Sequence, residues 1–96
     1  MRLQPSEREL ITSIARQIFG EGTSVSLFGS RVDDSLKGGD IDLYIRAADG
    51  VGAVSKKIDF LVALKLAIGD QKIDVVIAHD QSRLIEQQAM KYGVEL

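Results

Sequence analysis

The chain alternates between two spacings of apolar residues, one typical of helices and one typical of strands. Helical spacing predicts a first helix that begins near Ser6 and Glu9, which form a capping-box pattern, and that ends before Gly20. Further helices are predicted over residues 54–68 and 81–92. We expect their core-facing stripes to contain Leu10, Ile11, Ile14, Ala15 and Ile18; Val54, Ile58, Leu61, Val62, Lys65 and Ile68; and Leu84, Ile85, Gln88 and Ala89.

Three short segments instead show the period of two that is typical of strands, over residues 23–29, 40–47 and 72–78. In the second, the apolar face comprises Ile41, Leu43 and Ile45, and the other face Asp40, Asp42 and Tyr44. In the third, Ile73, Val75 and Ile77 lie opposite Asp74 and Val76. The order α-β-β-α-β-α predicts an α+β fold, in which helices flank a small mixed sheet of three to four strands.

Composition and charge limit the classes of protein that the chain can represent. Its 96 residues suit one domain over 1–96, and 45% hydrophobic with 27% charged residues is typical of a globular protein. The net charge of −2, with scattered Lys and Arg, offers no basic face, so we expect no direct nucleic-acid binding. The absence of cysteine excludes a disulfide scaffold and thiolate metal sites. Charges near the N-terminus interrupt any signal-peptide core and no apolar run is long enough for a membrane span, so a cytoplasmic location is expected.

Two aspartates interrupt the second predicted strand, where a buried carboxylate is costly. Asp40 and Asp42 have the same parity, so they share a face with Cα atoms about 6.6 Å apart. Asp74 interrupts the third strand in the same way. Carboxylates so placed can converge on one or two Mg²⁺ ions, and without a cation they would repel one another. A solvated edge strand is the alternative explanation for all three.

The turn before these aspartates contains groups suited to phosphate. Gly29 allows a close approach to the backbone, the Ser30 hydroxyl can donate a hydrogen bond, and Arg31 adds a positive charge. A simple turn and an exposed arginine are the alternatives. The segment does not fit a calcium loop, because Lys37 takes the place of an oxygen ligand, and it lacks the Gly-Lys-Ser/Thr ending of a P-loop.

Taken together, Gly29-Ser30, nine intervening residues, Asp40-Ile41-Asp42-Leu43 and a separate strand aspartate, Asp74, resemble the nucleotidyltransferase superfamily typified by DNA polymerase beta. The short chain most resembles the minimal nucleotidyltransferases, the antitoxins of bacterial HEPN/MNT toxin–antitoxin pairs. This resemblance implies a polymerase-beta-like fold, with two Mg²⁺ ions held by the three aspartates and the β- and γ-phosphates of ATP held by the Gly-Ser turn. It further implies that Asp74 activates the acceptor hydroxyl, and that AMP is transferred to a tyrosine of the HEPN-type toxin in a hetero-oligomer.

Asp33 and Asp34 depart from the pattern of many relatives, because they add negative charge beside a triphosphate site. They favour a second hypothesis, in which an inactive domain neutralises its partner by binding alone. A third hypothesis is nucleotidyl transfer to a small molecule. It is less favoured, because such an acceptor is usually bound by a second domain and we expect 96 residues to form only one. A C-terminal group of apolar residues suggests a surface for the partner: Leu84, Ile85, Met90, Val94 and Leu96.

Overall fold

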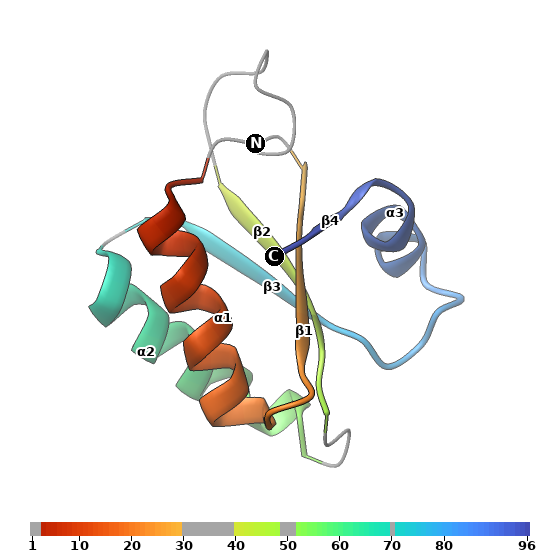
Figure 1. The fold of residues 1–96 in the computed structure, drawn as a ribbon. Coiled ribbons are helices and arrows are strands. Elements are labelled where there is room, and N and C mark those ends of the chain that lie inside the picture. The colour runs from red at the N-terminus through yellow and green to blue at the C-terminus, as the bar shows by residue number, and fades with distance from the viewer. Residues whose placement is uncertain (1–2, 30–39, 49–51, 70) are drawn as a thin grey trace.

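The computed structural model describes residues 3–29, 40–48, 52–69 and 71–96 and has a four-stranded mixed sheet at its centre (Figure 1). The strands are β1 (Ser24–Phe28), β2 (Ile41–Arg46), β3 (Ile73–Ile77) and β4 (Val94–Glu95), in the order β3-β2-β1-β4. β1 is antiparallel to β2 and to β4, whereas β2 and β3 are parallel. The α+β class and the three longer strands are confirmed, and β4 is an additional two-residue edge.

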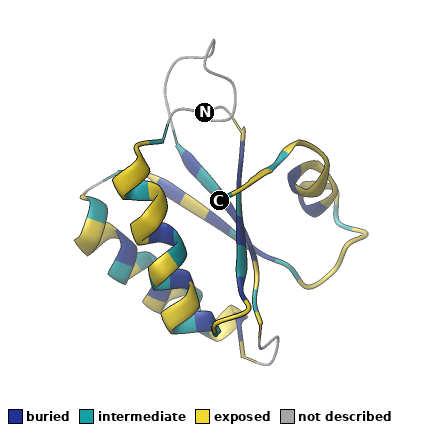
Figure 2. Cartoon of the chain, viewed as in Figure 1, coloured by how far each residue is buried: buried dark blue, intermediate teal, exposed yellow. Residues whose placement is uncertain are grey.

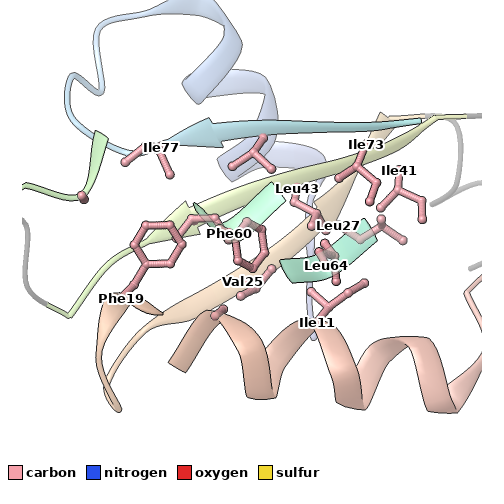
Figure 3. Close-up of a cluster of buried hydrophobic side chains, with 14 residues drawn as sticks. Ile11, Phe19, Val25, Leu27, Ile41, Leu43, Phe60, Leu64, Ile73 and Ile77 are labelled. Atoms are coloured by element: carbon pink, nitrogen blue, oxygen red, sulfur yellow. The ribbon is translucent and has the colours of Figure 1, made fainter. Parts of the chain in front are cut away.

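Two helices cover one face of this sheet, and a third lies on the other side (Figure 1). They are α1 (Pro5–Phe19), α2 (Lys57–Ile68), which follows the 3₁₀ turn η2 (Val54–Lys56), and α3 (Leu84–Tyr92). α1 and α2 pack on the apolar residues of β1, β2 and β3. Phe19 of α1 contacts Phe60 of α2, with ring centroids 5.4 Å apart and ring planes tilted by 53° (Figure 3). Burial of such side chains, each of which contributes about 1.5–3 kcal/mol, holds this layer together.

The helix starts and helix faces differ from the prediction in several places. α1 begins at Pro5, and its reciprocal cap is formed by Gln4 and Glu7, with the Gln4 N–H donating to the Glu7 carboxylate at 3.1 Å, rather than by Ser6 and Glu9. In α2 the buried residues are Phe60 and Leu64. The predicted stripe is wrong for Val54, Ile58, Val62 and Lys65, which are exposed, as is Leu66. Leu61 and Ile68 are partly buried. Figure 2 shows exposed positions along the outer sides of α1 and α2.

On the opposite face of the sheet, α3 packs against side chains of β1 and β2 that point away from the α1–α2 core. Ala89 of α3 contacts a small cluster with Phe28 and Tyr44. The predicted stripe of α3 is mostly wrong, because Leu84, Ile85 and Gln88 are exposed and only Ala89 is buried, while Glu86 is fully buried.

The predicted C-terminal apolar surface is confirmed only in part. Leu84, Ile85, Met90 and Val94 are exposed, whereas Leu96 is partly buried and packs against the α1–α2 side of the core. Among the residues that the structure describes, no helix has both the length and the apolar character needed to cross a membrane.

Candidate functional site

The candidate site lies at the end of the sheet where β1 ends and where β2 and β3 begin (Figure 1). Asp42 is the second residue of β2 and Asp74 the second residue of β3, and the parallel register pairs them directly. Both lie on the face opposite the α1–α2 core, because their strand neighbours Ile41 and Ile73 point into that core. The strands therefore bring two carboxylates from distant parts of the chain to adjacent positions.

Gly29 follows β1 at the same corner and touches the Asp42 carboxylate. Its φ of +79° is in the left-handed region, which favours glycine. A Cβ atom at this position would clash with the Oδ2 atom of Asp42. The predicted glycine turn is therefore in direct contact with one of the predicted aspartates, and only the absence of a side chain allows it.

The carboxylates influence one another electrostatically, as the sequence predicts. Partial burial of Asp42, followed by the negative charges of Asp74 and Asp40, raises the pKa of the Asp42 carboxyl group above its ordinary value. The positive charge of Lys72 opposes this effect. The corner therefore concentrates negative charge that a cation would relieve.

Lys72 is part of this corner and was missed by the sequence interpretation. Its Nζ atom lies 3.4 Å from Oδ2 of Asp40, and its carbonyl accepts a hydrogen bond from the Ile41 N–H at 3.0 Å. The parallel register aligns Asp40-Ile41-Asp42 with Lys72-Ile73-Asp74, so Lys72 lies beside Asp40. The matching motifs DID and KID in the sequence were the signal that could have predicted this pair.

The side chains as they stand do not form a complete metal-ligand shell. Within the described part of the chain, no three His, Cys, Asp or Glu side chains are grouped closely enough to hold a metal ion. Asp42 and Asp74 have the oxygen donors that Mg²⁺ prefers, and their register fits a shared ion. The Asp40 carboxylate pairs with Lys72 through Oδ2, so the ammonium competes with a metal ion for this third ligand.

A second buried polar network lies under α3. The fully buried Glu86 carboxylate accepts hydrogen bonds from the Tyr44 hydroxyl at 2.9 Å and from the backbone N–H groups of Asp80 at 2.9 Å and His79 at 3.3 Å. Arg83 lies 3.4 Å from the same carboxylate. Burial alone would raise the pKa of Glu86, but these donors outweigh it and lower that pKa. Burial and the bond to Glu86 in turn raise the pKa of Tyr44, so this phenol packs and donates beneath α3.

Of the predicted site residues, the structure brings together Asp42, Asp74 and Gly29, with Asp40 just before β2. Ser30, Arg31, Asp33 and Asp34 lie outside the described residues. His79, which follows β3, is exposed and contacts Arg83.

Comparison of the chain with protein-family models, with curated proteins and with solved structures gives no significant match.

Proposed function

We propose that the chain is a Mg²⁺-dependent nucleotidyltransferase that transfers AMP from ATP to a protein hydroxyl. The observation that carries this proposal is the register pair of Asp42 and Asp74, with Gly29 pressed against the Asp42 carboxylate. Two adjacent carboxylates and a glycine turn are the groups that a metal-bound triphosphate requires. The resemblance of the motif to minimal nucleotidyltransferases supports the same reaction.

In the proposed reaction, the aspartates of the corner bind the metal and one of them also accepts a proton. Asp42 and Asp74, together with Asp40, would hold Mg²⁺, which would neutralise charge on the phosphates. Asp74, the more exposed of the register pair, faces the acceptor and takes the proton from its hydroxyl group. The acceptor oxygen forms a bond to the α-phosphorus, the bond from that phosphorus to the bridging oxygen breaks, and pyrophosphate leaves.

The proposed acceptor is a tyrosine of a helical HEPN-type partner, which the chain would silence as an antitoxin. The exposed apolar residues support a partner of this kind. On α2, Ile58 is 71% and Leu66 83% exposed although the helix is apolar on every side, and a helix of that composition is ordinarily covered. Leu84 on α3 is 70% exposed.

A second candidate function is neutralisation of the partner by binding alone. The Lys72–Asp40 ion pair favours it, because an ammonium ion already balances part of the negative charge that would otherwise attract a metal. In this case the corner would bind no metal and the apolar surfaces would supply the affinity.

One experiment separates the two candidates. The purified chain is incubated with Mg²⁺, ATP labelled at the α-phosphate and the protein encoded by the neighbouring gene, and the intact mass of that protein is measured. We expect the mass of one or more AMP groups on the partner, and none with EDTA or with the Asp42→Asn variant. A stable complex without added mass would refute transfer and support the binding function.

A further inference from the structure

A hollow beside the glycine turn lies within reach of the proposed phosphate site. Its volume is about 300 Å³, and it is lined by Phe28, Gly29, Gln88 and Tyr92. Gly29 belongs both to this hollow and to the contact with Asp42. The space therefore begins where the carboxylate corner ends and extends under α3.

The side chains that line the hollow are suited to a flat aromatic ligand with polar edges. Tyr92 is 62% exposed and is available for stacking, and Phe28 contributes a second aromatic wall. The Gln88 side chain is exposed and makes no hydrogen bond to another described residue. Its amide offers both a donor and an acceptor, the pair that matches the N6 and N7 atoms of adenine.

A second hollow lies beside Tyr92 and has a cation at its edge. Tyr92 and Gln88 also line a neighbouring hollow with Leu84, Gln87 and Lys91. The Lys91 ammonium lies 5.3 Å from the centroid of the Tyr92 ring and belongs to that second hollow only. The cation therefore borders the second hollow and not the one that contains Gly29.

A larger hollow of about 420 Å³ does not serve the same purpose. It lies at the opposite end of β2 from Asp42 and is lined by Arg46, His79 and Glu86, among others. His79 and Glu86 are already engaged with Arg83, and Glu86 holds the segment between β3 and α3.

We infer that the hollow between β1 and α3 is the nucleobase subsite of this protein, in which Tyr92 stacks on an adenine and Gln88 reads its edge. The inference rests on the proposed function, because it places the triphosphate of the same nucleotide at Gly29 and Asp42. In this arrangement the side chains of α3, and not the carboxylate corner, distinguish ATP from nucleotides with other bases. Gln88 would pair poorly with guanine, because guanine presents two acceptors at this edge, N7 and O6, which arginine or lysine binds.

Binding measurements on the full chain test this inference with three ligands, ATP, GTP and inorganic tripolyphosphate, each with Mg²⁺. Isothermal titration calorimetry should show ATP binding more tightly than tripolyphosphate, which has no base. Tyr92→Ala should weaken ATP binding by about fivefold to a hundredfold and leave tripolyphosphate binding unchanged, whereas Tyr92→Phe should retain ATP binding. Gln88→Ala should reduce the ratio of ATP to GTP affinity. Gln87→Ala, which replaces the neighbouring exposed residue of α3, is the matched control and should leave the affinity for all three ligands unchanged.

The outcomes separate failure of the subsite from failure of the proposed function. If ATP and tripolyphosphate bind the wild-type chain equally well, or if Tyr92→Ala weakens both ligands equally, the base subsite is refuted while phosphate and metal binding stand. If neither ligand binds, the nucleotidyltransferase proposal fails and the subsite fails with it. Circular dichroism of each variant confirms that the fold is retained, so that a loss of ATP binding reports on the hollow.

Discussion

Replacement of Asp42 by asparagine should stabilise the metal-free protein while abolishing its response to Mg²⁺ and ATP. In the folded state the Asp42 carboxylate is half-buried and lies beside Asp74, so its negative charge is repelled and its pKa is raised. Asparagine keeps the shape of the side chain and removes the charge. The repulsion disappears, and so does a ligand for the cation.

The size of the stabilisation follows from the register of β2 and β3. Neighbouring strands lie about 4.8 Å apart, so the paired carboxylates are separated by roughly 5 Å. Two unit charges at that distance repel by about 3 kcal/mol at an effective dielectric constant of 20 and by about 0.8 kcal/mol in water. Because Asp74 is exposed and Lys72 supplies an opposing charge, we expect a value near the lower limit, about 1 kcal/mol. For a domain of this length that corresponds to a rise in Tm of about 4–8 °C.

Thermal unfolding followed by circular dichroism measures both effects, first in EDTA and then with Mg²⁺ and ATP. Wild-type protein should gain about 2.7 kcal/mol at a ligand concentration of 100 Kd, and the Asp42→Asn variant should gain almost nothing. The matched control is Glu21→Gln, which removes one exposed carboxylate in the turn before β1, at the opposite end of the sheet. An Asp42→Asn variant that is less stable than wild type in EDTA, or that keeps the full ligand-induced rise, would refute the charged corner as the cation site.

Three further predictions test this corner and the buried network under α3. Gly29→Ala should destabilise the fold by about 1–2 kcal/mol through its positive φ, and should also reduce the Mg²⁺–ATP shift by displacing the Asp42 carboxylate. Chemical denaturation of Gly69→Ala is the control, since Gly69 has a φ of +94° but no neighbour near its Cβ position. Asp74→Asn should abolish transfer of AMP but leave partner binding intact, as measured by intact mass and size-exclusion chromatography; continued transfer would remove Asp74 from the reaction. Glu86→Gln should cost about 1.5–3 kcal/mol at neutral pH by weakening charge-assisted hydrogen bonds. The pKa of Glu86 is lowered in the folded state, so its contribution to stability is present above the unfolded pKa and is lost as the pH falls through the folded pKa. Urea titrations should therefore show the stabilities of the wild-type and Glu86→Gln proteins converging in acid. A difference in stability that does not depend on pH would contradict this.

Strands and their faces were predictable because a period of two leaves little freedom. Asp42 and Tyr44 had to share one face once Leu43 was assigned to the core, and the structure confirms this arrangement. The register was predictable in principle from the matching motifs at Asp40 and Lys72, since a slip of one residue would turn Ile73 out of the core. The sequence pattern does not predict the positive charge of Lys72 beside Asp40. A lysine before a strand reads as an ordinary exposed residue until the partner strand is known.

Helix faces were less predictable, and the reason is physical. α2 carries apolar residues on every side, so periodicity alone cannot select which of them are buried. The packing of Phe60 against Phe19 of α1 decides the orientation and turns Ile58 to the exterior. In α3 the buried face is set by Glu86, because its carboxylate accepts hydrogen bonds from the Tyr44 hydroxyl and from the backbone N–H of Asp80 before the helix. That bond fixes the rotation of α3 about its axis, and the same rotation brings Gln88 and Tyr92 beside Gly29. A buried acid far from the aspartates thus determines which side chains border the proposed nucleotide site.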